Sequence, residues 1–302
     1  MMKYTIRYVS LLAGMLTVFS SCEHKDLCFD HDAHAPKSDV HIKAVYEKEW
    51  EHTCEGGPDW EQYPAWESRF GMDYHELCPD APDGLRIQVY NEDGTNNVLN
   101  VAPEGDIVRM RPGEHSLLLY NNDTEYIVFD DMNSFASAKA TTRTRTRASY
   151  GGNPYMENTV ENTVNAPDML YGNYMENYTA ERKTETDELP VTMHPLVFTY
   201  LVRYEFSHGL EYVALARGAL AGMAGAVWLN SGRTSEEAVT ILYDCSVEDF
   251  GAQACVHSFG IPDYPNEHYT ARAERRYGLN LEVRLKLSLI HISEPTRLAL
   301  IS

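Results

Sequence analysis

The sequence predicts an all-β protein built from two antiparallel β-sandwiches, of which the second is truncated. Short segments of alternating or β-branched residues recur at intervals of about ten residues, with turn-forming Gly, Pro, Asn and Asp between them. Strands do not alternate with long amphipathic helices, which excludes a βαβ fold. A length of 302 residues is enough for about two domains with cores of their own.

Residues 39–138 carry the strand signals of the predicted N-terminal β-sandwich. Apolar residues alternate from Val40 to Tyr46, as in a strand with one buried face. Asp93-Gly94 is a hairpin signal, and Pro112-Gly113 marks a second strand–turn–strand unit. The strands predicted around these turns cover residues 40–46, 85–89, 98–101, 107–110, 116–120 and 126–129.

Residues 139–189 are predicted to be a linker or insertion between the two domains. They are rich in Asn, Tyr, Thr and Glu, show no clear apolar period, and contain Tyr-Met-Glu-Asn twice, at 155–158 and 174–177. An irregular segment of this length is unusual inside one domain, so it favours a domain boundary. The C-terminal β-sandwich is then expected over residues 190–286, beginning with the β-branched and aromatic run 197–206.

The first residues resemble a bacterial lipoprotein signal peptide, which we assign to residues 1–21. Lys3 and Arg7 precede an uncharged run that is too short to span a bilayer but has the length of a signal-peptide core. Small residues then lead to Cys22, the predicted lipid attachment site, and residues 22–38 form a polar tether. The alternative is an ordinary secretory signal with an incidental cysteine.

The last residues, 287–302, are predicted to be foreign to the protein. Residues 287–297 resemble one reading frame of a translated sequencing-library adapter. Native sequence would then stop near Lys286, inside a strand whose apolar residues alternate from Leu279 to Leu285, and the second sandwich would be incomplete. The alternative is a genuine C-terminal strand.

Charge and cysteine content limit the partners and the redox state. A net charge of −20 leaves no broad basic face, so nucleic acid is excluded as a partner. Of the 6 cysteines, Cys22 is assigned to lipid. Export to an oxidising compartment would permit disulfides between Cys54 and Cys78 and between Cys245 and Cys255, but spacing alone establishes neither pair.

The motifs in the sequence do not aim a nucleophile, a base or a metal ligand at a common point, so no catalytic residue, cofactor or metal is predicted. His24, Cys28 and His31 do lie together in the tether. A hydrated tether is favoured there over a metal site, because chelation would have to order a flexible segment.

Aromatic residues between the first two predicted strands form a candidate ligand platform. Trp60, Trp66 and Tyr74 lie in an acidic, loop-like segment, with Phe70 between the last two. Aromatic faces can stack on the apolar faces of sugars, while neighbouring carboxylates take the hydroxyl groups. The alternative is a loop that packs its own rings over the sandwich.

Three stretches carry a resemblance to a known family: Cys22–His31, Leu118–Glu125 and Tyr212–Gly222. Over nearly the whole chain to Lys286, the sequence resembles an uncharacterised family of Bacteroidales-type lipoproteins. The resemblance implies a distant relation to fimbrillins and to the lipoproteins that anchor or terminate fimbriae, which have two transthyretin-like sandwiches. The resemblance implies an outer-membrane location through lipid on Cys22 and association with fimbrial subunits by strand donation to an open sheet edge. It provides no catalytic residues.

These features leave three hypotheses on function. The first is a non-enzymatic, lipid-anchored envelope protein of the fimbrial-anchor or adhesin type, on the periplasmic or the cell-surface face of the outer membrane. The alternative is a glycan-binding surface lipoprotein that would use the aromatic platform. The third is an enzyme or metal-handling lipoprotein, and a hydrolase of glycans would need two carboxylates that face each other across a cleft.

Overall fold

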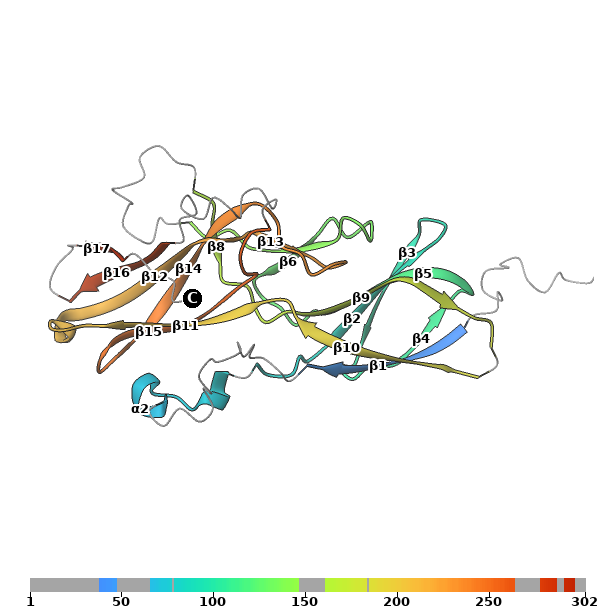
Figure 1. The fold of residues 1–302 in the computed structure, drawn as a ribbon, viewed down its shortest axis with the longest axis horizontal. Coiled ribbons are helices and arrows are strands. Elements are labelled where there is room, and N and C mark those ends of the chain that lie inside the picture. The colour runs from blue at the N-terminus through green and yellow to red at the C-terminus, as the bar shows by residue number, and fades with distance from the viewer. Residues whose placement is uncertain are drawn as a thin grey trace, which may run out of the picture. The chain divides into compact units, whose positions relative to one another are not determined.

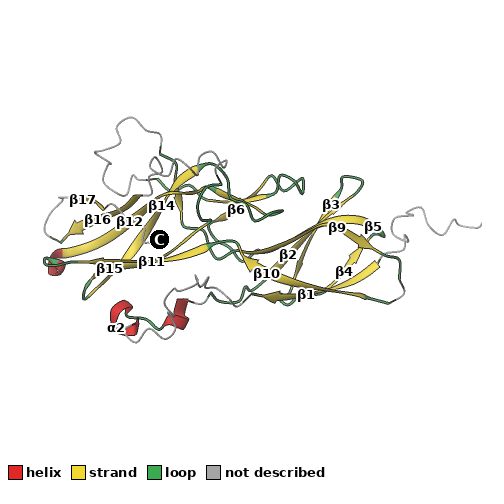
Figure 2. Ribbon diagram, in the orientation of Figure 1, coloured by secondary structure: helices red, strands yellow, loops and turns green. Residues whose placement is uncertain are grey.

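The computed structural model describes residues 38–47, 66–77, 79–146, 161–183, 185–263, 278–286 and 291–296. Within these ranges the regular structure is almost entirely β-strand (Figures 1 and 2), and the all-β fold class predicted from the sequence is confirmed. The exceptions are one α-helix and two short 3₁₀ helices in the described part of the chain, namely α2 (Trp66–Phe70), η1 (Tyr74–Leu77) and η3 (Leu210–Tyr212). The predicted signal peptide lies outside the described residues.

The first β-sandwich consists of two sheets that are joined along one edge. One sheet has the order β3 (Asn96–Val101), β2 (Leu85–Asn91), β5 (Gly113–Asn121) and β9 (Tyr171–Ala180). The other has the order β10 (Asp187–Pro195), β1 (Ser38–Tyr46) and β4 (Ile107–Met110). The joint between them is short, because β9 and β10 pair at two positions only, His194 with Gly172 and Pro195 with Tyr171.

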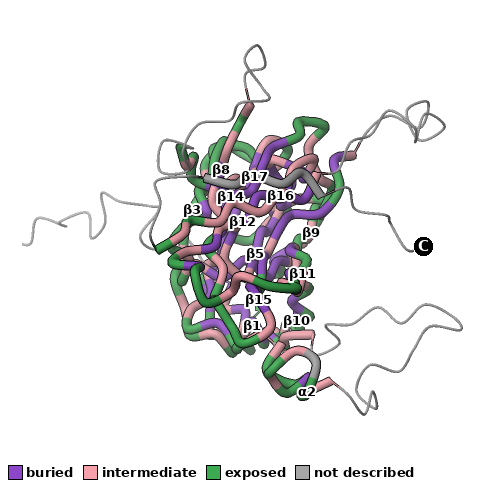
Figure 3. Tube along the Cα trace, turned by 90° about the vertical axis from the view of Figure 1, so that its left-hand side faces the viewer, coloured by how far each residue is buried: buried purple, intermediate pink, exposed green. Residues whose placement is uncertain are grey.

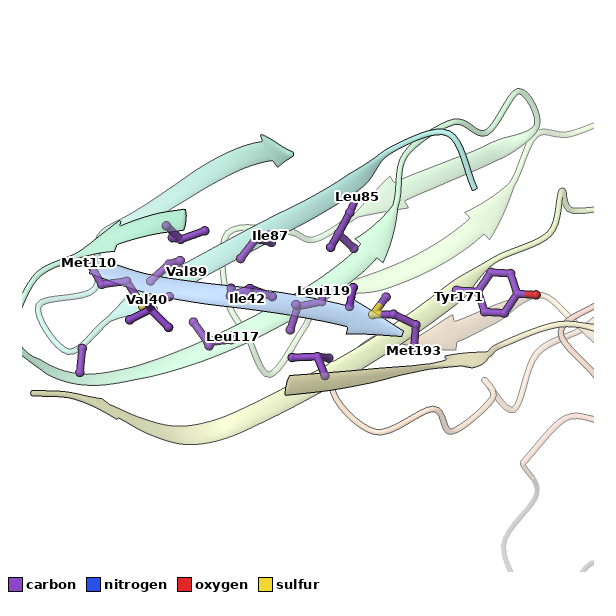
Figure 4. Packing of buried hydrophobic residues seen from close by; sticks show 14 residues of the cluster. Val40, Ile42, Leu85, Ile87, Val89, Met110, Leu117, Leu119, Tyr171 and Met193 are labelled. Atoms are coloured by element: carbon purple, nitrogen blue, oxygen red, sulfur yellow. The ribbon is translucent and has the colours of Figure 1, made fainter. Parts of the chain in front are cut away.

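Alternating side chains fill the space between these two sheets. Val40 and Ile42 point from β1 toward Ile87, Leu117 and Leu119 of the facing sheet (Figure 4), and none of the five is more than 1% exposed. β1 pairs in parallel with β10 and antiparallel with β4, so it lies in the middle of its sheet. The strand predicted over 40–46 is therefore buried on one face and hydrogen-bonded along both edges.

A small third sheet covers the other face of β2 and β5. Its order is β13 (Ala226–Trp228), β7 (Lys139–Thr142) and β6 (Ile127–Asp130). Leu118 and Tyr120 of β5 belong to the same hydrophobic cluster as Ile127, Ala140 and Val227 of this sheet. Since β5 is covered on both faces, its residues from Leu117 onward are buried without alternation. Figure 3 shows buried residues, in purple, in the interior of the described fold and exposed residues mainly around its outside.

The second β-sandwich packs two further sheets against each other. One contains β11 (Phe198–Glu205) and β15 (Gly251–Ser258). The other has the order β8 (Thr163–Asn165), β14 (Ala238–Glu248), β12 (Val213–Ala224), β16 (Gly278–Leu285) and β17 (His291–Thr296). The end of β14 crosses over to pair with β15, as in the pair Ser246 and Gln253. Tyr204, Leu220 and Ile241 lie in the core between the sheets.

The structure differs from the expected linker at residues 139–189. Its described parts contribute β9 and the start of β10 to the first sandwich, β7 to the third sheet and β8 to the second sandwich. One face of β9 is exposed, with Tyr174 and Glu176 on it, and Met175 and Tyr178 pack against the first core. The polar composition therefore reflects a strand with one solvated face. The first copy of the near-repeat, 155–158, lies outside the described residues, and the second lies in β9.

The residues just after β7 are also held in place. Arg145 donates to the carboxylate of Asp244 at 2.8 Å and to the carbonyl oxygen of Leu242 at 3.0 Å, both on β14. Thr144 forms an isolated bridge to Val164 of β8. These contacts attach the segment to the second sandwich.

Strand β10 was expected in the C-terminal sandwich, residues 190–286, but it belongs to the first one. Val191 and Met193 lie in the first core, and β10 pairs with β1 from the other end of the described chain. Pairing over such a long separation leaves no local signal in the sequence. Residues 291–296 form β17 beside β16, and the predicted foreign origin of residues 287–302 stays a prediction.

The loop before β4 depends on a glycine. The amide of Ile42 donates to the carbonyl oxygen of Asp106 at 3.1 Å, and that of Ala44 donates to the carbonyl oxygen of Glu104 at 2.9 Å. Gly105 between them has φ +99°, and a Cβ atom there would collide with the carbonyl oxygen of Ile42. The missing side chain lets this loop continue the β4 edge along β1.

We expect Gly105→Ala to destabilise the protein more than Gly94→Ala. Both glycines have positive φ, which costs a residue with a Cβ about 1–2 kcal/mol, but the space around Gly94 is open. Only the Gly105 variant must also displace the loop from β1. Urea unfolding of the two variants measures the difference, and equal losses would contradict the proposed packing of this loop.

Candidate interaction site

A hollow of about 600 Å³ lies where the two sandwiches meet the segment that follows α2. Its walls come from η1 and the residues after it, from the end of β5, from the residues before β9, and from β15. Its carboxylates are those of Glu76, Asp80, Asp83, Asp123 and Asp168, and its other polar side chains include those of Asn121, Cys255 and His257.

Asp168 uses its carboxylate to hold the protein's own backbone. Its Oδ2 accepts hydrogen bonds from the amides of Glu125, Tyr126 and Ile127, at 2.8, 2.6 and 3.2 Å. These three donors precede and begin β6, so a single side chain fixes the path of the chain from β5 into the third sheet. This role in holding the fold accounts for a carboxylate at the wall of the hollow.

Asn121 and Asp123 close a second set of bonds at the end of β5. Asn121 donates to the carbonyl oxygen of Met169 at 3.0 Å and accepts from the amide of Tyr171 at 2.7 Å. Asp123 accepts from Asn121 at 2.7 Å and from the amide of Asp83 at 2.8 Å. Polar groups of the hollow thus join β5, β9 and the residues before β2, which makes the hollow a structural joint.

Cys255 and His257 face the hollow from β15. The walls of the hollow desolvate the thiol of Cys255, an exposed residue, and this raises its pKa. Burial lowers the pKa of His257, although the carbonyl of Pro167 and the charge of Asp168 act in the opposite direction. No hydrogen bond joins the thiol of Cys255 to the imidazole of His257 within the described residues, and such a bond is the geometry by which a base activates a nucleophile. Within the described ranges, no three His, Cys, Asp or Glu side chains are placed to hold a metal ion.

The disulfide considered between Cys245 and Cys255 is wrong, because both cysteines are free thiols. Ser246 lies opposite Gln253, so Cys245 comes opposite Ala254 and its side chain points to the core side of the sheet. Cys255 points to the other side, where it lines the hollow. Side chains on opposite faces of a sheet cannot be bridged. Cys54 and Cys78 lie outside the described residues.

Trp66 and Tyr74 of the predicted platform pack against each other. The ring centroids are 5.0 Å apart in an edge contact, and the ring of Phe70 lies 4.4 Å from that of Trp66. Tyr74 is buried, and Gln253 of β15 donates to the carbonyl oxygen of Phe70 at 2.9 Å. The described rings hold α2 and η1 together over β15. Trp60 and the lipid site Cys22 lie outside the described residues, and a sugar platform stays a prediction.

Sheet edges offer main-chain groups to a partner, and the described edge strands β3, β4 and β10 carry features that oppose such pairing. Strand β4 has four residues, one of them Arg109, and β3 contains three asparagines. Strand β10 begins with two acidic residues and has Pro190, which lacks an amide hydrogen. The edge strand β11 begins Phe-Thr-Tyr-Leu-Val, with no charge, Pro or Gly. The sequence predicted this strand within 197–206 but could not indicate that it lies at an edge.

Comparisons with known proteins relate this chain to a family model, to a curated relative and to a solved structure. Residues 61–244 match the family model described as "Domain of unknown function (DUF5119)". The chain is 25% identical over 175 residues to the "Putative fimbrium anchoring subunit Fim4B" of Bacteroides ovatus. That match covers 57% of this chain and 50% of the relative, so the chain spans about half of the relative's length.

A solved structure shares the fold. It is described as a "putative adhesin" from Bacteroides ovatus, with a TM-score of 0.56 and 20% identity, and the alignment covers 88% of this chain and 85% of the other. These comparisons confirm the predicted resemblance to a Bacteroidales family of unknown function with distant fimbrial relatives. Among the helices of the described residues, none is long and apolar enough to cross a membrane.

We expect Asp168→Ala to destabilise the protein by about 1–3 kcal/mol, because three backbone amides lose their acceptor. Asp168→Asn keeps one oxygen acceptor and should lose less. Thermal unfolding of both variants measures this order. An Asn variant that is as unstable as the Ala variant would show that charge, and not hydrogen bonding, supports the loop.

Both described cysteines should react slowly with iodoacetamide at pH 8. Desolvation raises the pKa of Cys245 to about 12 and also raises the pKa of Cys255, so both thiols are mostly protonated at pH 8. Alkylation should speed up as the pH rises, and it should become fast in urea. Mass spectrometry of non-reduced peptides checks the same residues, and a peptide that links Cys245 to Cys255 would contradict the sheet geometry.

Proposed function

Because the chain belongs to the DUF5119 family of domains of unknown function, we propose that it is a non-enzymatic protein of the cell envelope, of the fimbrial-anchor or adhesin type. The observation that carries this proposal is the similarity to a relative named as a fimbrium anchoring subunit. The adhesin-like fold of two sandwiches is consistent with it.

In this proposal, lipid on Cys22 holds the protein at the outer membrane. The support is the uncharged run behind Lys3 and Arg7 that ends in small residues before this cysteine. In this proposal the polar residues 22–38 are the tether between the lipid and the sandwiches. The proposed partners are fimbrial subunits, which would add an extended segment to one of the sheets.

We expect Cys22→Ala to release the full chain from the membrane fraction of a Bacteroides host, because the variant has no site for lipid. Cys28→Ala is the matched control, since it removes a nearby cysteine that does not follow the small residues. Fractionation and immunoblotting measure the partition. A Cys22 variant that stays with the membranes to the same extent as the control would overturn the anchor.

The association with fimbriae is tested in the organism that carries the gene. Envelopes are solubilised in detergent, the full chain is captured through a tag, and the bound proteins are identified by mass spectrometry. Enrichment of fimbrial subunits over an untagged strain is the expected result. Their absence from the capture, with the chain itself recovered, would overturn the fimbrial assignment.

A further inference from the structure

Strand β11 has main-chain groups that point away from its own sheet. The amide of Phe206 donates to the carbonyl oxygen of Phe250 at 2.9 Å, which makes these two residues a hydrogen-bonded pair. Such pairs alternate along an antiparallel ladder, and the register of β11 with β15 has no shift. The amides and carbonyls of Thr199, Leu201 and Arg203 therefore point outward. Within the described residues nothing accepts or supplies hydrogen bonds along this edge.

The core of the second sandwich is also incompletely covered beside β11. Tyr200 and Val202 point into the core but stay half-buried, whereas Ala252 and Val256 on the adjacent β15 are buried. Tyr204 donates to the carbonyl oxygen of Asn280 at 3.3 Å, so β11 lies across from β16. An added strand would thus gain main-chain hydrogen bonds and would cover apolar side chains at the same time.

The two ends of this edge differ in chemistry. At the start of β11, Phe198 is 51% exposed and lies over Gly260, and Ile261 next to that glycine is also 51% exposed. At the other end, Glu205 and the turn residues Glu248 and Asp249 are exposed. The guanidinium of Arg203 also lies at this end, and its Nε is 3.0 Å from Oε1 of Glu205. The edge is therefore apolar at one end and acidic at the other.

We propose that the free edge of β11 accepts an extended segment of a partner protein, with apolar side chains along its length and a basic end beside Glu205. This inference rests on the proposed function, in which the partner is a fimbrial subunit. Charge favours a different protein over a second copy of this chain, because two chains of net charge −20 repel each other. An acidic end on β11 would instead attract Lys or Arg of the incoming strand.

The test uses the purified full chain and a short peptide of alternating Thr and Val with Lys-Lys at its N-terminus. An antiparallel peptide would place these lysines at the acidic end. The variant is Leu201→Pro, which removes an outward amide and leaves the ladder to β15 intact. The matched control is Val98→Pro on the edge strand β3. Its amide also points outward, because Asn91 donates to the carbonyl oxygen of Thr95 at 2.8 Å and the ladder alternates from there.

The peptide should bind the wild type and Val98→Pro equally, and Leu201→Pro about tenfold more weakly, which corresponds to the loss of about one main-chain hydrogen bond. The same peptide with Glu-Glu in place of Lys-Lys should bind more weakly. Hydrogen exchange of the wild type needs no variant, and the amides of Thr199, Leu201 and Arg203 should be protected only when the peptide is bound.

Two results would overturn the proposal. The first is equal peptide binding by Leu201→Pro and the wild type. The second is a wild-type dimer that Leu201→Pro dissociates, because a second copy would then be the occupant of the edge. Neither result depends on the capture of fimbrial subunits from envelopes. Failure of the edge and failure of the fimbrial assignment are therefore distinguishable.

Discussion

The burial of β5 on both faces is the constraint on which the rest of the structure depends. Leu117 and Leu119 face the first core, while Leu118 and Tyr120 face the third sheet. A strand of this kind needs a layer on each side, because half of its side chains would otherwise stay in water. The sheet of β1, β4 and β10 supplies one layer, and β6, β7 and β13 supply the other.

Both covering layers are completed by strands that are distant in the sequence. The parallel partner of β1 is β10, which follows β9 in the chain although β9 belongs to the opposite sheet. The partner of β7 is β13, which lies in the second half of the chain. Arg145, just after β7, adds an ion pair to Asp244 of β14 in the second sandwich. The described strands β7 and β13 therefore connect the two halves of the chain through the third sheet.

Several polar and aromatic side chains that could bind a ligand are instead engaged in contacts within the fold. The carboxylates of Asp123 and Asp168 line the hollow, but their oxygens accept hydrogen bonds from the protein's own amides. The aromatic rings of Trp66 and Tyr74 contact each other. Within the described residues, β11 is by contrast an edge strand whose outward main-chain groups have no hydrogen-bond partner.

The sequence by itself determined the all-β class, most of the strands with one buried face, and the turns between them, because alternation and turn residues are local signals. It also pointed to the family through stretches such as Leu118–Glu125. Only the tertiary structure decided that the polar segment 171–180 is a strand of the first sheet, that Cys245 and Cys255 face opposite ways, and that β11 lies at an edge. Each of these depends on which distant strand lies alongside, and pairing between distant strands leaves no periodic mark in either segment.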